Sequence, residues 1–219
     1  VSGTAAATGG AYSGTQSLTF TLDTSAPTVT LTDTDSDNVV NVSQVVTITA
    51  IFSETMAATP TISITGIVTN VIMTPIAGTT SYTYRWDTSS GTLTTGNYTA
   101  TVSGTDLIGN PYVAGTQSIT FRVDTTSPTL TITTPSGPKV SNSSLVVTLT
   151  YDEAVTGLTT NTAQFSEAIN IASLQLLSAS SDGRTYTVRI TPQAEGLVKL
   201  THAPGSPPVQ DLAGNSIAS

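Results

Sequence analysis

An internal repeat constrains this chain more than any other feature of its sequence. Residues 14–31, Gly-Thr-Gln-Ser-Leu-Thr-Phe-Thr-Leu-Asp-Thr-Ser-Ala-Pro-Thr-Val-Thr-Leu, recur with few changes at residues 115–132, a spacing of 101 residues. In each copy, apolar residues alternate with polar ones on both sides of an Asp-to-Pro break, which is typical of two strands joined by a short hinge. A period of about 100 residues is the size of a small β-sandwich domain. We therefore interpret each copy as the last strand of one domain, a linker and the first strand of the next.

The repeat divides the 219 residues into three parts. Residues 1–23 are predicted to be the C-terminal strand and loop of a preceding repeat, 24–124 a complete β-sandwich, and 125–219 a second β-sandwich that lacks its last strand. Because the chain begins inside a repeat, we expect it to be part of a longer protein. Short alternating runs between turn signals, without a helical pattern, predict an all-β fold of antiparallel sandwiches. The strands expected in the complete unit are 28–32, 45–52, 60–65, 68–74, 82–86, 97–103 and 117–123.

Charge and composition narrow the classes of function. The formal net charge is −8, which argues against nucleic acid as a partner, because nucleic-acid binding needs basic patches. The same charge favours a cation such as calcium. No apolar run is long enough to span a membrane, so no membrane insertion is predicted for this segment. The chain has no cysteine, and a small extracellular domain without disulfides needs another means of stiffening, for which a metal ion is the obvious candidate.

Six acidic residues are expected to meet in two groups. In a sandwich of this strand order, the linker that enters the domain, the loop after the second strand and the loop before the last strand share one end. The residues at these places are Asp23, Glu54 and Asp106 in the complete unit, and Asp124, Glu153 and Asp211 in the second. Calcium takes six to eight oxygen ligands, so each group is a candidate calcium site that would fix the linker to its sandwich. The alternative is that these aspartates only accept backbone N–H bonds in turns.

A further acidic loop, residues 33–38, carries carboxylates at alternate positions, Asp33, Asp35 and Asp37. This pattern is similar to the start of an EF-hand loop. The sixth position is Asn38 rather than Gly and the twelfth is Gln44 rather than Glu, so a complete EF-hand is not expected. Two interpretations stay open, a calcium site and a solvated acidic turn. The corresponding residues 135–139 of the second unit include no carboxylate.

Several short motifs resemble a known family. Phe52-Ser53-Glu54, Gly96-Asn97-Tyr98, residues 106–110 and residues 124–128 together resemble the bacterial Ig-like tandem repeats of large cell-surface adhesins. Residues 53–66 are most similar to repeats of the gliding-motility type of adhesin. The resemblance implies tandem immunoglobulin-like sandwiches in an elongated rod, outside the cell or on the bacterial surface, with calcium at the domain joints. The implied partners are neighbouring Ig-like repeats of the same chain, surface glycans, and host or substratum surfaces.

Enzymatic interpretations find little support in the sequence. There is no cysteine nucleophile, no Gly-x-Ser-x-Gly elbow and no phosphate loop. His202, the one histidine, lies at the end of an expected strand and is predicted to be a surface residue. Tyr82, Tyr84 and Trp86 alternate along one strand, and an exposed aromatic row of this kind could stack on sugars. Trp86 is instead predicted to belong to the core. Tyr98 occupies the position of a corner tyrosine.

The sequence therefore predicts a structural, non-enzymatic stalk or adhesion segment with calcium-stiffened joints. Two alternatives stay open. One is a carbohydrate-binding accessory module of a secreted enzyme. The other is a fibre subunit in which the strand expected at Ser17–Leu22 completes the sandwich of a neighbour by β-augmentation.

Overall fold

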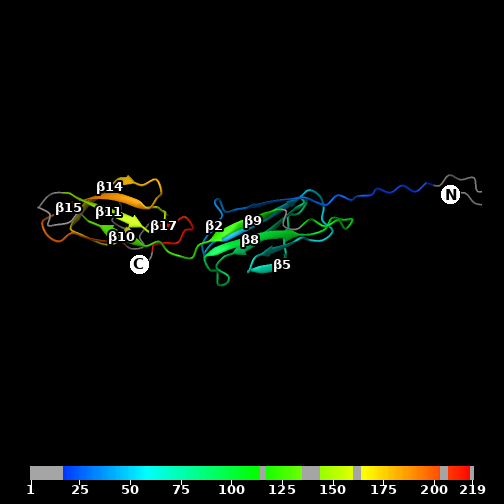
Figure 1. The fold of residues 1–219 in the computed structure, drawn as a ribbon, viewed down its shortest axis with the longest axis horizontal. Coiled ribbons are helices and arrows are strands. Elements are labelled where there is room, and N and C mark those ends of the chain that lie inside the picture. The colour runs from blue at the N-terminus through cyan, green and yellow to red at the C-terminus, as the bar shows by residue number, and fades with distance from the viewer. Residues whose placement is uncertain (1–16, 114–116, 135–143, 160–163, 203–206, 218–219) are drawn as a thin grey trace, which may run out of the picture.

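The structure of the chain is a computed structural model, which describes residues 17–113, 117–134, 144–159, 164–202 and 207–217. Its regular elements are strands β1–β17, paired almost entirely antiparallel, and the described residues contain no helix long and apolar enough to cross a membrane. Most of residues 1–23, predicted to belong to a preceding repeat, and all of the loop 135–139 lie outside the described residues. Figure 1 shows two groups of strands, which follow one another along the chain.

The first group forms a sandwich of two sheets. One sheet has four strands in the order β1-β3-β7-β6, and the other has five in the order β2-β9-β8-β4-β5, in which β2 pairs parallel with β9. The strands are β1 (Val29–Asp33), β2 (Val39–Val40), β3 (Val45–Phe52), β4 (Thr61–Ile64), β5 (Val68–Ile72), β6 (Thr74–Pro75), β7 (Ser81–Asp87), β8 (Gly96–Ser103) and β9 (Ser118–Val123).

Alternation places apolar side chains between these two sheets. Along β3 every second residue is buried, while the residues between them are mostly threonines and other residues that face outward. Trp86 from β7 and Phe121 from β9 meet across the sandwich with ring centroids 5.3 Å apart, and Phe52 packs edge-on against Tyr82 at 5.9 Å. Trp86 is 2% exposed, so the prediction that it belongs to the core is confirmed. Tyr82 is also buried, and Tyr84 is partly buried against the same core.

The second group repeats the plan with smaller sheets. A four-stranded sheet has the order β10-β11-β15-β14, and two short antiparallel pairs, β12-β17 and β13-β16, lie outside it. The strands are β10 (Leu130–Thr133), β11 (Leu145–Tyr151), β12 (Val155–Thr156), β13 (Phe165–Ile169), β14 (Ile171–Ala179), β15 (Thr185–Pro192), β16 (Lys199–His202) and β17 (Gln210–Asp211). A separate cluster of buried apolar residues, which includes Leu149, Tyr186 and Ile190, forms the core of this second sandwich.

Strand register shows which elements correspond in the two sandwiches. Val29 lies opposite Phe52 in the first, as Leu130 lies opposite Tyr151 in the second. The bridge between Met56 and Asp106 corresponds to the pair β12-β17, and the pairing of β4 with β8 corresponds to that of β13 with β16. Within the described residues of the second sandwich, no strand takes the place that β9 has in the first.

The strands predicted from alternation are present, some with shifted ends. The strand expected at 45–52 has these bounds in the structure, and that expected at 68–74 is divided into β5 and β6. The two-residue strand β2 was not predicted, because two residues are too few to show a period. Residues 17–22, which the alternation predicts as a strand, form no ladder in the structure, since no described strand pairs with them.

Candidate metal centres

The first acidic cluster consists of Asp23, Glu54 and Asp106. Asp23 precedes β1, Glu54 follows β3, and Asp106 begins the turn after β8. One carboxylate oxygen from each residue lies within 4.8 Å of the others. Asp106 is 1% exposed, whereas Asp23 and Glu54 are half-buried. The structure thus brings together the three residues that strand order places at one end of the sandwich.

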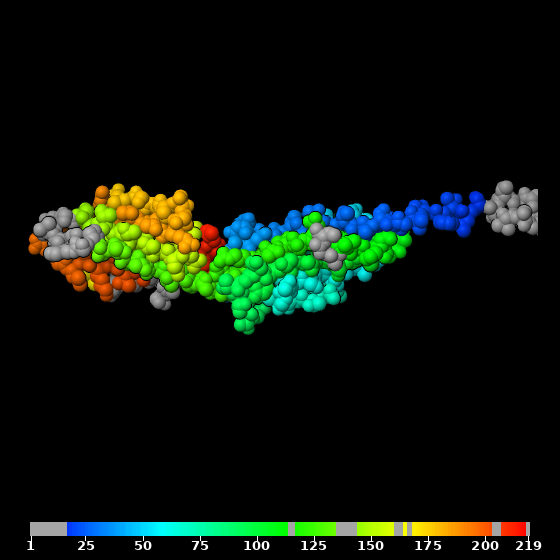
Figure 2. Space-filling model, viewed as in Figure 1, coloured from blue at the N-terminus to red at the C-terminus, as the bar shows by residue number. Residues whose placement is uncertain are grey.

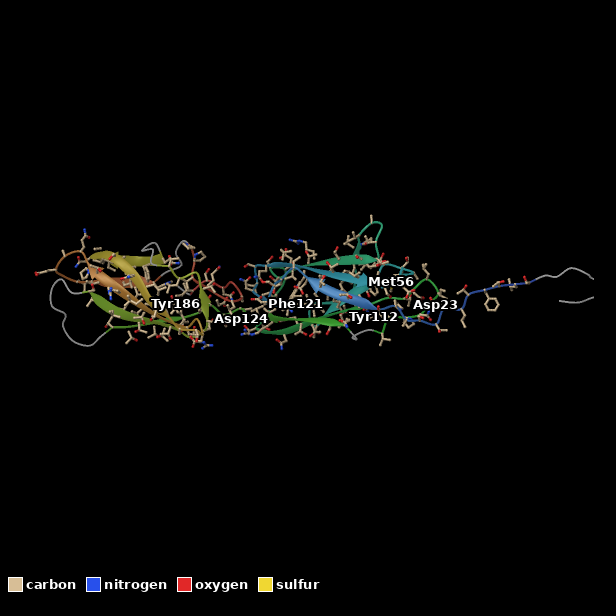
Figure 3. All side chains as sticks on the ribbon, turned by 90° about the horizontal axis from the view of Figure 1, so that it is seen from above. Asp23, Met56, Tyr112, Phe121, Asp124 and Tyr186 are labelled. Atoms are coloured by element: carbon tan, nitrogen blue, oxygen red, sulfur yellow. The ribbon has the colours of Figure 1, made fainter. Side chains whose placement is uncertain are left out.

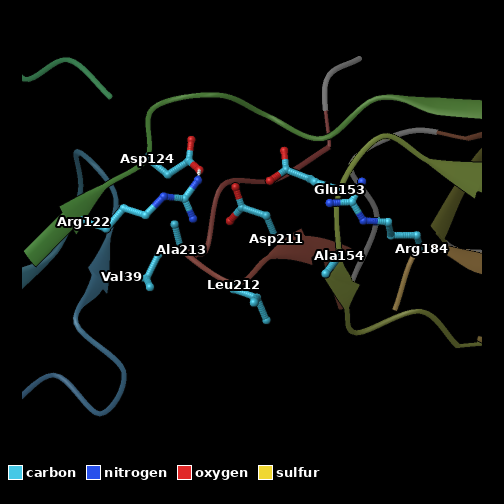
Figure 4. Close-up of a pocket in the computed structure, with 9 residues that line it drawn as sticks. All are labelled: Val39, Arg122, Asp124, Glu153, Ala154, Arg184, Asp211, Leu212 and Ala213. Carbon is cyan, nitrogen blue, oxygen red and sulfur yellow. Dashed lines mark hydrogen bonds and ion pairs between the residues drawn. The ribbon is translucent and has the colours of Figure 1, made fainter. Parts of the chain in front are cut away.

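The second acidic cluster consists of Asp124, Glu153 and Asp211, from the equivalent three segments of the second sandwich. One carboxylate oxygen of each again lies within 4.8 Å of the others. Asp124 and Asp211 are 3% and 4% exposed, and Glu153 is half-buried. Figure 4 shows the three carboxylates in one pocket, with the guanidinium group of Arg122 beside Asp124. Figure 3 shows that Asp23 and Asp124 lie at opposite ends of the first sandwich, with Phe121 between them.

A turn of sequence Asp-x-x-Gly-Asn carries one buried aspartate of each cluster, Asp106 in the first and Asp211 in the second. In the first, Oδ1 of Asp106 accepts hydrogen bonds from the backbone N–H groups of Ile108, Gly109 and Asn110, at 2.9, 2.7 and 2.8 Å. Oδ2 of Asp106 accepts one from the side-chain amide of Asn110 at 2.8 Å. Asp106 therefore accepts backbone N–H bonds within its turn, as the alternative to a calcium site predicts. Oδ2 makes a single such bond, so it keeps a lone pair that a cation could use.

The asparagine of this turn also holds the incoming linker, a role that the motif did not suggest. Nδ2 of Asn110 donates to the backbone carbonyl of Asp23 at 3.2 Å, and Nδ2 of Asn215 donates to that of Asp124 at 3.0 Å. Gly and Asn are both residue types that tolerate positive φ. In the structure the glycine of each turn has positive φ and the asparagine does not. The side-chain amide of the asparagine therefore holds the linker to the turn by a hydrogen bond, without a metal.

The two clusters differ at one position of the repeat. Nη2 of Arg122 donates to Oδ2 of Asp124 at 2.9 Å, forming an ion pair in the second cluster. The repeat has Thr21 at the corresponding place beside Asp23. Oδ1 of Asp124 accepts from the backbone N–H and the hydroxyl of Thr126, at 3.1 and 2.6 Å. Part of the charge in the second cluster is therefore already balanced by an arginine.

Hydrogen bonds favour the ionised forms of Asp106 and Asp124 in spite of their burial. Burial alone would raise the pKa of Asp106, but the bonds from Asn110, Ile108 and Gly109 outweigh it, and the pKa lies below its ordinary value. The pKa of Asp124 is lowered in the same way, by Thr126 and Arg122 acting against burial.

Glu153 responds in the opposite direction. Burial is the main cause that raises its pKa, and the negative charges of Asp211, Asp124 and Asp152 add to the effect. Its neighbour Asp152 points elsewhere and accepts from the N–H and hydroxyl of Thr129, both at 2.8 Å. The second cluster therefore disfavours the ionised form of Glu153, and a bound cation would stabilise that form.

The acidic loop at 33–38 is arranged differently. Oδ1 of Asp33 accepts from the N–H of Asp35 at 2.8 Å, and Oδ1 of Asp37 accepts from the N–H of Val39 at 3.1 Å. Burial, followed by the charge of Asp37, raises the pKa of Asp35, whose Oδ2 is buried without a hydrogen-bond partner. Among the described residues, oxygens of all three aspartates do not approach one another as they do in the two clusters. The structure thus gives this loop weaker support as a metal site than it gives the clusters.

His202 packs against aromatic side chains of the second core. The prediction that His202 is a surface residue is wrong, because its ring packs 5.1 Å from that of Phe165 and 6.3 Å from that of Tyr151, and both of its nitrogens are shielded from solvent. The cause is that β16 turns His202 toward the second core, at the position of Val102 in the first.

The corner tyrosine is confirmed, since the hydroxyl of Tyr98 donates to the carbonyl of Thr94 at 3.1 Å and accepts from its N–H at 3.2 Å.

Comparison with known proteins agrees with the architecture. No curated protein matches the chain. Residues 124–219, which contain the second acidic cluster and the second sandwich, match the family model of the bacterial Ig-like domain. This fold is a non-catalytic one and is typical of structural or surface proteins. The matched part of the chain is therefore a domain of the bacterial Ig-like type.

Proposed function

We propose that this chain is a structural, non-enzymatic stalk or adhesion segment of a secreted or cell-surface bacterial protein, in which calcium stiffens the domain joints. The observation that carries the proposal is the pair of acidic clusters. Each combines a carboxylate from an incoming linker with two from the sandwich that follows it. A cation at this place would hold linker and sandwich together.

The donor set of both clusters fits calcium. Carboxylate oxygens within 4.8 Å of one another can share an ion whose bonds to oxygen are about 2.3–2.6 Å long. Asp23, Glu54 and Asp106 would hold the ion in the first cluster, and Asp124, Glu153 and Asp211 in the second. The first cluster is the better candidate, because in the second the guanidinium group of Arg122 already bonds to one oxygen of Asp124. The ion would supply charge compensation and a link between three segments.

Calorimetry with calcium and with a chelator tests the proposal. At a calcium concentration about 100 times the dissociation constant, binding stabilises the folded state by about 2.7 kcal/mol, which raises the melting temperature of a 100-residue domain by roughly 10–20 °C. Glu54→Gln should remove this increase for the first sandwich and Glu153→Gln for the second. The matched control is Glu195→Gln, because Glu195 is exposed and belongs to neither cluster. Identical melting curves with calcium and with chelator would contradict calcium binding.

The carbohydrate-binding alternative receives no support from the aromatic side chains. Trp86 and Tyr82 face the core, so they do not form an exposed row on which a sugar ring could stack. The stalk function is therefore the one that the described residues favour.

A further inference from the structure

We propose that Arg122 sets the calcium affinity of the second acidic cluster, because its guanidinium group is a tethered cation that calcium must displace from Asp124. The first acidic cluster therefore takes up calcium at lower concentrations than the second. This inference rests on the proposed function, calcium binding at the clusters, and adds the residue that makes the two clusters unequal.

Arg122 belongs to the first sandwich but reaches the cluster of the second. The backbone N–H groups of Arg122 and Asp124 donate to the carbonyls of Asn38 and Val40, at 2.8 and 2.9 Å, so the strand β2 fixes both residues. Residues two apart in an extended chain project to the same side, which directs the arginine toward the aspartate. Figure 2 shows residues 207–217 of the second sandwich, coloured red, next to the first sandwich. The joint thus receives a cation from β9.

The contact is an ion pair between a buried carboxylate and a largely exposed cation. Nη2 of Arg122 lies 2.9 Å from Oδ2 of Asp124, and the two side chains are 58% and 5% exposed. Oδ1 of Asp124 already accepts two hydrogen bonds from Thr126. A calcium ion that takes Asp124 as a ligand must therefore compete with one of these partners. The arginine is the one that can move away into solvent.

A second arginine lines the same pocket and is offset by an aspartate. Figure 4 shows Arg122 and Arg184 on opposite sides of the three carboxylates. The guanidinium group of Arg184 donates to the backbone carbonyl of Asp152 at 2.6 Å. In the first sandwich, neutral residues take the same places in the hydrogen-bond pattern, Thr80 for Arg184 and Ser53 for Asp152. Arg184 and Asp152 thus add one positive and one negative charge, and Arg122 remains as the excess cation.

The repeat gives the first cluster no counterpart of this cation. Thr21 stands at the position of Arg122, two residues before Asp23. The carboxylates themselves are of the same types in both clusters, two aspartates and one glutamate, and in both they lie within 4.8 Å of one another. The difference in calcium affinity is therefore expected to come from the arginine rather than from the carboxylates.

A fixed positive charge opposes calcium binding in two ways. Calcium must break the ion pair before it can use Oδ2 of Asp124. The guanidinium group is attached to β9 and stays near the cluster after it has moved, so it continues to repel the bound ion. Removal of this charge should tighten calcium binding at the second cluster at least about tenfold.

Equilibrium dialysis with calcium tests the proposal on one cluster at a time. In a Glu54→Gln background, the remaining calcium binding belongs to the second cluster. Arg122→Thr, which introduces the residue of the first repeat, should lower the dissociation constant there at least about tenfold. Arg122→Lys keeps the charge and should lower it much less. Glu153→Gln isolates the first cluster, whose dissociation constant should be smaller than that of the second cluster with Arg122 in place.

Arg85→Thr is the matched control. Arg85 pairs with Asp87, two residues later, at 3.3 Å, and neither residue belongs to a cluster. The variant removes the same charge from the chain, so it should leave both dissociation constants unchanged. Arg122→Gln serves as a second neutral variant, and thermal melts in chelator show that each variant is folded.

The possible outcomes separate this inference from the proposed function. Calcium binding that Arg122→Thr leaves unchanged or weakens would overturn the role of Arg122 and leave calcium at the clusters intact. Equal tightening by Arg85→Thr would indicate a general effect of net charge and would overturn it as well. Dialysis without bound calcium in every variant would refute calcium at the clusters, and this inference with it.

Discussion

At the scale of single residues, each acidic cluster combines two kinds of carboxylate. Asp106 is fixed by four hydrogen bonds within its own turn, whereas no hydrogen bond to Glu54 is recorded among the described residues. Asp106 therefore contributes to stability with or without a cation. We expect Glu54 to contribute to stability only when a cation is bound. This is why a glutamine at position 54 or 153 is the sharper probe of metal binding than any change of the aspartates.

His202 leads to a prediction about acid stability. Burial lowers its pKa below the ordinary value of 6.5, since both ring nitrogens are shielded and have no hydrogen-bond partner among the described residues. The unfolded chain therefore binds a proton more readily than the folded one, so stability should fall as the pH drops below about 6.5. His202→Val, which introduces the residue of the first sandwich at this position, should reduce this loss.

Thermal melts between pH 7 and pH 5 check this prediction. The lowered pKa values of Asp106 and Asp124 act in a different window, because the stability that they contribute is lost only as the pH falls below their ordinary value of 3.8. A parallel pH dependence of the second transition in wild type and His202→Val would contradict a role for the histidine.

At the scale of elements, the corner formed by Tyr98 connects β8 to the loop that precedes it. The ring lies 6.2 Å from Trp86, and the hydroxyl bonds to the backbone of Thr94. The side chain thus fixes the start of a central strand both by packing and by hydrogen bonds. In the second sandwich Val198, directly before β16, takes this place and has no hydroxyl group.

Tyr98→Phe isolates the contribution of the hydroxyl. The ring keeps its packing, and the backbone groups of Thr94 lose their partner, so the free energy of unfolding of the first sandwich should fall. Urea denaturation followed by the fluorescence of Trp86, the one tryptophan, measures this change. Tyr84→Phe is a suitable control because Tyr84 packs at the margin of the same core. Equal losses of unfolding free energy for both variants would contradict a specific contribution of the bonds between the Tyr98 hydroxyl and Thr94.

At the scale of the whole molecule, two separate cores are joined by the short segment between β9 and β10. Hydrogen bonds between described residues cross the joint. Asn215 donates to the carbonyl of Asp124, and Nε2 of Gln44 donates to the carbonyl of Ala213 at 3.3 Å. Such bonds contribute little individually. We therefore expect the orientation of the two sandwiches to depend on whether the second acidic cluster holds calcium.

Small-angle scattering tests this expectation. With calcium the profile should be that of an elongated rod, and a chelator should increase flexibility and change the radius of gyration. Glu153→Gln in calcium should behave like the wild type in chelator, while Glu54→Gln should not, because its cluster lies at the opposite end of the first sandwich. Superimposable profiles with calcium and with chelator would mean that calcium does not fix the orientation of the two sandwiches.

The sequence alone determined the all-β class, most strand positions and which acidic residues could meet. These features follow from alternation and from a repeat spacing of 101 residues, both of which can be read along the chain. Only the tertiary structure decided that Asn110 holds the linker, that Arg122 pairs with Asp124, and that His202 faces a core. The bond of Asn110 and the packing of His202 depend on contacts between segments far apart in the sequence. The Arg122–Asp124 pair depends on how two side chains only two residues apart are oriented. Alternation assigns a side chain to one face of a strand, but packing between sheets decides what it meets there.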